Sequence, residues 1–206
     1  MKKILTTLIM CLMCLYLEAQ SFNQTAAINE ISAATASISS MKCDFVQTKS
    51  LKMLGNKMVS KGQMFCKQPD KLRWEYTSPY AYTFILNNNK ILLRKGKHND
   101  VIDVNQNKMF KEIAKIIMNN VMGQSLTNKK EFSVSVAPKD RYYLITLIPQ
   151  KKEIKQLFSK VILHYDKKAA AIVTIELHEK NGDSTQIELQ NINKNTAINA
   201  SMFQIN

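Results

Sequence analysis

The chain has 206 residues and carries 29 lysines and arginines against 16 acidic residues, which gives a formal net charge of +13. Nucleic-acid-binding proteins gather such charge into patches with interleaved aromatic residues, whereas here it is spread along the sequence, so we predict no nucleic-acid partner. The charge is typical of a basic solvated surface, and it also fits attraction to anionic lipid head groups or to an acidic partner.

The sequence starts with the features of a secretory signal peptide. Two lysines precede an apolar run from Ile4 to Leu17, and a small residue, Ala19, stands before Gln20. The run is too short for a membrane-spanning helix, which needs about 20 apolar residues. We therefore expect residues 1–19 to be removed near Ala19/Gln20, an exported periplasmic product, and one domain over residues 20–206.

An amphipathic helix over residues 24–39 and a β-hairpin are expected next. Apolar residues recur at helical spacing in "QTAAINEISAATASIS", and the period changes to two in "KCDFVQTKSLKML" and "MVSKGQMFCKQP", on either side of a turn at Gly55-Asn56. One allowed register of this hairpin places Cys43 opposite Cys66, the only cysteines left after the signal peptide. These residues are either a disulfide of an oxidising compartment or two small buried hydrophobic side chains.

Short strands separated by turn residues then predict an antiparallel meander. The expected strands cover residues 71–77, 81–87, 90–95, 100–104, 130–137, 141–148, 157–166, 170–179 and 184–192, with a final short strand in "NASMFQIN". In the last long hairpin, a three-residue loop at 181–183 would set Leu177 opposite Ile187. A second amphipathic helix interrupts the meander at residues 107–123, with an apolar stripe of Phe110, Ile113, Ile117 and Val121.

These elements predict a mainly antiparallel α+β fold of about ten to eleven strands with two amphipathic helices. Two helices are few to cover the apolar face of so large a sheet. Either the sheet curls into a barrel, or part of its apolar face remains a cavity.

Residue patterns that carry catalysis or bind metal are missing from the sequence. The three histidines, His98, His164 and His178, have no second ligand at metal-binding spacing. There is no nucleophile elbow, P-loop or dinucleotide fingerprint, and Cys43 has no sign of a base beside it. We therefore expect a binding protein rather than an enzyme, with no cofactor and no metal.

The apolar residues in the middle of the chain are the main functional signal. In "QPDKLRWEYTSP", residues 68–79, the only tryptophan stands between Arg73 and Glu75. Because successive side chains of a strand point to opposite faces, these charged residues would face water and the apolar ones the other side. The two prolines mark the ends of the strand. The apolar set is either core or the wall of a pocket covered by a helical lid, and its members are Leu72, Trp74, Tyr76, Phe84, Leu86, Leu92, Phe110, Ile113, Ile117 and Val121.

The order and spacing of four motifs resemble the LolA family of periplasmic lipoprotein carriers and the LolA-like proteins around them. The motifs are "SSMKCDFVQ", "KGQMFCKQPDKLRWEYTSP", "ILNNNKILL" and the closing "NASMFQIN". The resemblance covers essentially the mature chain. It implies an open, incomplete β-barrel lidded by amphipathic helices, whose apolar cavity takes up the acyl chains of a lipoprotein for delivery towards the outer membrane.

The resemblance also implies roles for individual residues. Gln68 stands where the family has an arginine that helps latch the lid, and a glutamine donates hydrogen bonds but carries no charge. The implied partners are acylated lipoproteins, an inner-membrane lipoprotein-releasing transporter and an outer-membrane acceptor, with the protein acting as a monomer. The acyl cavity would be lined by Phe45, Leu72, Trp74, Tyr76, Phe84, Leu86, Phe110, Ile113, Ile117 and Val121.

Other functions remain open at this point. A LolA-like sensor or accessory protein in envelope stress, or in specialised lipid or pigment export, would bind lipid or a misplaced lipoprotein. An enzyme acting on a lipid would need a nucleophile and base that the sequence does not offer. An exported β-protein whose apolar face is only core would bind none of these.

Overall fold

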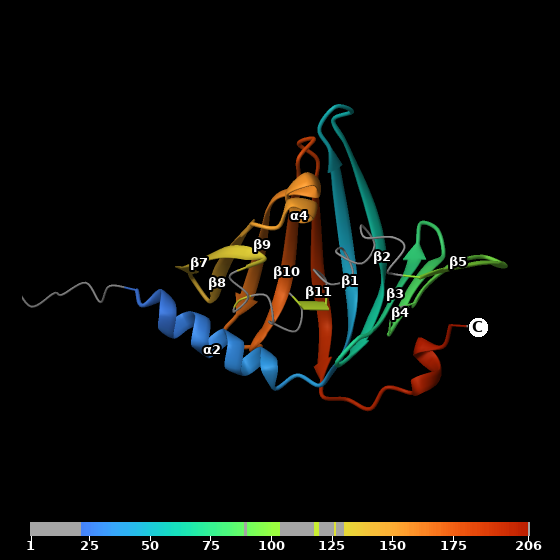
Figure 1. Cartoon of the computed structure of the whole chain (residues 1–206), viewed down its shortest axis with the longest axis horizontal. Coiled ribbons are helices and arrows are strands. Elements are labelled where there is room, and N and C mark those ends of the chain that lie inside the picture. The colour runs from blue at the N-terminus through green and yellow to red at the C-terminus, as the bar shows by residue number, and fades with distance from the viewer. Residues whose placement is uncertain (1–21, 89, 104–117, 120–125, 127–129, 206) are drawn as a thin grey trace, which may run out of the picture.

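The computed structural model, shown in Figure 1, describes residues 22–88, 90–103, 118, 119, 126 and 130–205. The expected signal peptide lies outside the described residues. So do Phe110, Ile113, Ile117 and Val121 of the second expected helix, although Met118 and Asn119 are helical. The roles of these four residues therefore stay predictions. None of the described helices is long and apolar enough to traverse a bilayer.

An eleven-stranded antiparallel sheet forms the body of the described residues. Its order is β6-β5-β4-β3-β2-β1-β11-β10-β9-β8-β7, and the edge strands β6 and β7 do not pair with each other. This confirms the expected mainly antiparallel, incomplete barrel. The strands are β1 Ser40–Leu51, β2 Asn56–Lys67, β3 Lys71–Ser78, β4 Tyr82–Asn87, β5 Lys90–Lys95, β6 His98–Asp103, β7 Phe132–Lys139, β8 Tyr142–Pro149, β9 Phe158–Asp166, β10 Ala171–Glu179 and β11 Ser184–Lys194.

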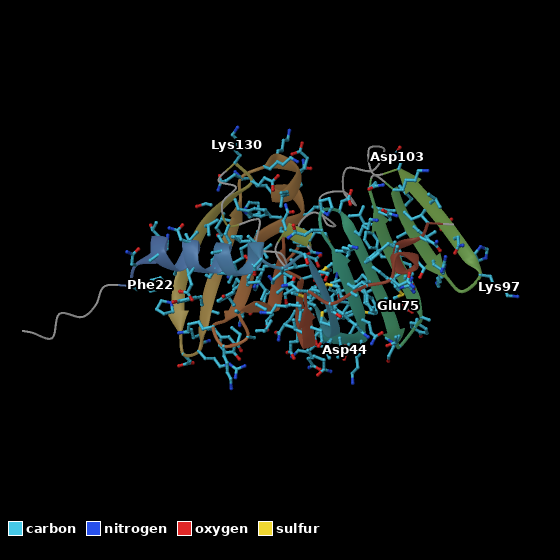
Figure 2. The ribbon with its side chains drawn as sticks, turned by 90° about the horizontal axis from the view of Figure 1, so that it is seen from below. Phe22, Asp44, Glu75, Lys97, Asp103 and Lys130 are labelled. Atoms are coloured by element: carbon cyan, nitrogen blue, oxygen red, sulfur yellow. The ribbon has the colours of Figure 1, made fainter. Side chains whose placement is uncertain are left out.

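Helix α2, Gln24–Ala36, covers one end of the apolar face of this sheet. Asn23 caps the helix by accepting a hydrogen bond from the Ala26 amide at 3.0 Å. The Gln24 side chain accepts from the Val136 amide of β7 at 3.1 Å, which ties the helix to that edge. In Figure 2, Phe22 at the start of α2 and Lys97 in the β5–β6 turn mark opposite ends of the sheet.

The main core lies on this face of the sheet, under α2 at one end, and it takes buried side chains from every strand except β6, whose partly buried Ile102 packs against it. Its largest fully buried members include Phe45, Phe132 and Tyr165. Met118 and Leu126, from the segment between β6 and β7, are also buried in it. A short helix that the sequence pattern did not predict, α4 Lys152–Leu157, adds Ile154 to the same core.

A second, smaller core lies on the opposite face of the sheet, where the chain ends. The expected final strand is wrong, because residues Ala200–Phe203 form a 3-10 helix, η3, capped by Asn199. The fully buried ring of Phe203 packs against Phe65, Ile85 and Leu92. Leu92 therefore faces away from the main core, contrary to expectation. An apolar patch on this outer face needs a cover, and the C-terminal segment supplies it (Figure 1).

The first long hairpin is displaced by two residues from the register that would pair its cysteines, and the last long hairpin by two residues from its expected register. Met64, not Cys66, lies opposite Cys43, and Thr185, not Ile187, lies opposite Leu177. The first turn occupies residues 52–55, with Gly55 in the left-handed region at φ 63°. A slip of two residues keeps every side chain on its face, so alternation does not distinguish these registers.

Candidate functional site

Six of the predicted cavity residues converge on one face of the sheet. β1, β2, β3 and β4 are neighbours, and Trp74 of β3 lies opposite Phe84 of β4 while Leu72 lies opposite Leu86. The shared face results from strand alternation, as predicted. All six belong to the main core or pack against it: Phe45, Leu72, Trp74, Tyr76, Phe84 and Leu86.

Aromatic rings form the centre of this site. The Phe45 ring centroid lies 4.4 Å from that of Trp74 and 5.2 Å from that of Tyr76, the second in edge-on geometry. Phe45 and Trp74 are almost fully buried, with exposed fractions of 1% and 4%. Tyr76 and Phe84 are only half-buried. The aromatic surface therefore runs from a packed interior to a partly open rim.

Gly62 makes this packing possible, and it is not among the residues predicted for the site. A Cβ atom at Gly62 would lie 1.9 Å from the Glu75 carbonyl oxygen and 2.7 Å from Cζ of Phe45. The register between β2 and β3 also shifts at this position. A glycine inside a strand is a recognised sign of such a close approach, so the signal was present in the sequence.

A polar contact lies at the rim of this face. The Tyr76 hydroxyl donates to Oε1 of Gln47 at 3.0 Å. Burial raises the pKa of Tyr76, and interactions with Trp74 and Gln47 oppose this shift. The buried Nε1 of Trp74 has no hydrogen-bond partner among the described residues. Such a surface suits an apolar ligand better than a polar one.

The charged residues beside Trp74 lie on the opposite face, as predicted, but they are not simply solvated. The Arg73 guanidinium pairs with the Glu75 carboxylate, with Nη2 2.7 Å from Oε2. Arg73 also donates to the Met202 carbonyl at 3.4 Å, and both side chains are partly covered. Arg73 therefore helps to hold the C-terminal segment against the outer face.

Gln68, the predicted latch, contacts the segment that follows α2. Its Nε2 donates to the Ile38 carbonyl at 2.8 Å, and its backbone amide donates to the Ser39 carbonyl at 2.9 Å. This glutamine thus joins the β2–β3 turn to the exit of α2. A contact with the second expected helix would fall on residues 107–123, most of which lie outside the described residues.

Cys43 and Cys66 are free, buried thiols in the main core. The structure therefore has the second of the two expected states, and the disulfide pairing is not present. Because the register is shifted, Cys66 lies opposite Met41 and its thiol donates to the Met41 carbonyl at 3.7 Å. Burial raises the pKa of both thiols, and that of Cys66 reaches about 12.

We expect these thiols to be unreactive in the folded protein. The thiolate is the reactive form, and a raised pKa leaves almost none of it at neutral pH. The chain beginning at Gln20, treated with a thiol-specific dye at pH 8, should be labelled at least about 100 times more slowly in buffer than in guanidinium chloride. Both thiols should react after denaturation without reductant. Labelling that appears only after addition of a reductant would reveal a disulfide and contradict this prediction.

Comparison with known proteins identifies the family of this chain. Residues 36–206 match the family described as "Outer membrane lipoprotein carrier protein LolA". An outer-membrane lipoprotein carrier protein of Legionella pneumophila (strain Lens) is 25% identical over 187 residues, covering 90% of this chain and 87% of the relative. Its counterpart from Methylobacillus flagellatus is 25% identical over 178 residues, covering 86% and 83%.

Solved structures share the fold at much lower identity. MucB matches with a TM-score of 0.54 and 10% identity, covering 88% of this chain and 62% of MucB. An uncharacterized conserved protein from Thermus thermophilus matches with a TM-score of 0.52 and 6% identity, covering 86% and 93%. These likenesses support the fold alone. Because the family match spans most of the sequence, the chain belongs to the outer membrane lipoprotein carrier protein LolA family.

Proposed function

We propose that this protein is a periplasmic carrier that binds the acyl chains of lipoproteins and delivers them towards the outer membrane. The observation that carries the proposal is the aromatic face, where buried Phe45 and Trp74 continue into the half-buried Tyr76 and Phe84 on an unclosed sheet. Family membership supports the same function. An inner-membrane releasing transporter and an outer-membrane acceptor are the partners that such a carrier requires.

The energetics of acyl binding favour an open site of this kind. Burial of an acyl chain contributes about 0.8 kcal/mol per CH₂ group, so two or three fully enclosed chains would be released very slowly. A carrier must release its cargo, and the displacement of packed side chains or of a lid costs free energy that offsets part of this gain. An acceptor with a better apolar site can then take the cargo without an energy source.

Trp74 gives the proposal a direct test, because it is the only tryptophan of the chain and lies within the aromatic face. The protein beginning at Gln20 is titrated with a triacylated peptide whose acyl chains carry bromine, which quenches tryptophan fluorescence at short range. We expect saturable quenching by the brominated peptide and none by the same peptide without acyl chains. Absence of quenching by both peptides, in protein that remains folded, would refute acyl binding at this face.

The identity of the bound molecule distinguishes a carrier that delivers lipoproteins from a sensor. Native mass spectrometry of the protein taken directly from the periplasm of its own cells should show a bound triacylated lipoprotein if the protein is a carrier. A bound free lipid would instead favour a LolA-like sensor or an accessory role in lipid export.

A further inference from the structure

The turn of the β1–β2 hairpin exposes an unusual group of large apolar side chains. We call residues 52–59 the hairpin tip. Its apolar side chains have exposed fractions of 95% for Met53, 67% for Leu54, 58% for Met58 and 50% for Val59. Single exposed hydrophobic residues are ordinary, but contiguous ones mark an interaction site. In Figure 1 this tip projects at the same end of the sheet as the β10–β11 turn and α4.

The surroundings of the hairpin tip are basic. From Asp44 to Asp70 the intervening sequence holds no acidic residue, and four of its lysines lie in the tip or in the strand halves next to it, namely Lys49, Lys52, Lys57 and Lys61. Two acids reach this end from the neighbouring hairpin, one held in an ion pair and the other in a backbone hydrogen bond with the β1–β2 hairpin. Glu179 forms an ion pair with Lys49 at 3.1 Å, and the Asp183 carboxylate accepts from the Lys52 amide at 2.9 Å. The tip therefore presents apolar side chains flanked by positive charge.

The hairpin tip is also held in place. The Lys52–Asp183 hydrogen bond joins the β1–β2 turn to the β10–β11 turn across the middle of the sheet. Gly182 lies against the Lys52 side chain so closely that a Cβ atom there would be 2.6 Å from Cδ of Lys52. Because the second hairpin supports the first, the apolar side chains of the tip are presented at a fixed position rather than collapsing onto the sheet.

A membrane surface matches this combination better than a second protein molecule does. Methionine and leucine side chains enter the boundary between head groups and acyl chains, while lysine side chains reach back to the lipid phosphates. Each lysine near an anionic membrane strengthens binding about fivefold. A second copy of this chain would bring an equally basic tip, and like charges would oppose that contact.

We infer that the hairpin tip docks this protein onto anionic phospholipid bilayers, with Met53 and Leu54 inserted below the head groups and Lys57 against lipid phosphate. Docking of this kind does not require the aromatic face to hold a ligand. It would bring the carrier close to the membranes between which cargo is exchanged.

Sedimentation with lipid vesicles tests this inference. The protein beginning at Gln20 is mixed with vesicles of phosphatidylglycerol and phosphatidylcholine, or of phosphatidylcholine alone. We expect binding to the anionic vesicles only. The double variant Met53→Ser/Leu54→Ser should bind at least about tenfold more weakly, since each side chain loses apolar burial. Lys57→Gln should weaken binding about fivefold at low salt and much less at high salt.

Val101→Ser is the matched control, because Val101 is also a half-exposed apolar residue, at 53%, but lies on the edge strand β6. It should bind vesicles as the unchanged protein does. Equal binding by the tip double variant, or no binding to anionic vesicles at all, would overturn the inference. So would a dimer in sedimentation equilibrium that the tip double variant abolishes, since the tip would then serve self-association. Quenching of Trp74 fluorescence by the brominated peptide is measured in each variant. If the quenching is retained, the variant has lost membrane docking without losing acyl binding.

Discussion

Replacement of Phe84 by glutamate is expected to lower the affinity for an acylated peptide about 100-fold, which corresponds to roughly 2.7 kcal/mol. Phe84 lies opposite Trp74 and is half-buried, so a carboxylate at this position would stand beside any acyl chain on the aromatic face. An acyl chain that packs there must strip water from the charge, and this desolvation is costly. Fluorescence titration with the brominated peptide, as described above, measures the loss.

Thr77→Glu is the control for this variant. Thr77 is exposed and belongs to the alternate set of β3 residues that includes Arg73 and Glu75, so the same charge is added on the outer face. We expect its affinity to stay within about twofold of the unchanged protein. Trp74→Glu should also abolish binding, but it places a charge in the packed core and should lower stability as well. Full affinity in Phe84→Glu would show that acyl chains do not occupy this face.

Phe203→Ala should lower the free energy of unfolding by about 3 kcal/mol. The Phe203 ring has no exposed surface and holds the C-terminal segment against Ile85 and Leu92. Its removal leaves a cavity in the smaller core and uncovers apolar side chains on the outer face of the sheet. Urea unfolding followed by far-ultraviolet circular dichroism gives the change directly.

Two further measurements make the Phe203 result specific. Gln204→Ala, an exposed change one residue later, should alter stability by less than about 0.5 kcal/mol. Acyl affinity in Phe203→Ala should remain unchanged below its unfolding transition, because Phe203 and the aromatic face lie on opposite faces of the sheet. A loss of stability under about 1 kcal/mol would mean that the C-terminal segment is dispensable.

Local pattern was sufficient for the limits of most strands and for the residues that share a face. β3 spans Lys71–Ser78 against an expected 71–77, and Pro69 and Pro79 flank it because proline cannot donate within a sheet. Trp74 and its apolar neighbours lie on one face because side chains alternate along a strand regardless of its partners. For the same reason, Tyr76 and Phe84 could be predicted to share a face with Trp74, whereas their role in acyl binding, and that of Phe45, stays a prediction.

Register was fixed only in part by the sequence. The alternation of side chains predicts which residues share a face, but it does not distinguish registers that differ by two residues. Both long hairpins keep the predicted faces and differ by two residues in register. The turn decides which of these registers forms, and in the first hairpin the turn consists of residues 52–55. The thiol states of Cys43 and Cys66 follow from this choice, since the observed pairing sets each cysteine opposite a methionine.

Only the tertiary structure decided which strands are neighbours and which segments cover each face of the sheet. The sequence by itself determined a largely antiparallel chain with one strongly apolar face and the aromatic residues on it. It could not show that β1 pairs with β11, that Leu92 turns outwards, or that "NASMF" forms a helical turn over Phe65 and Ile85. These features depend on contacts between residues far apart in the chain. Such contacts are stabilised by the burial of apolar surface, which does not depend on the local sequence pattern of the covering segment.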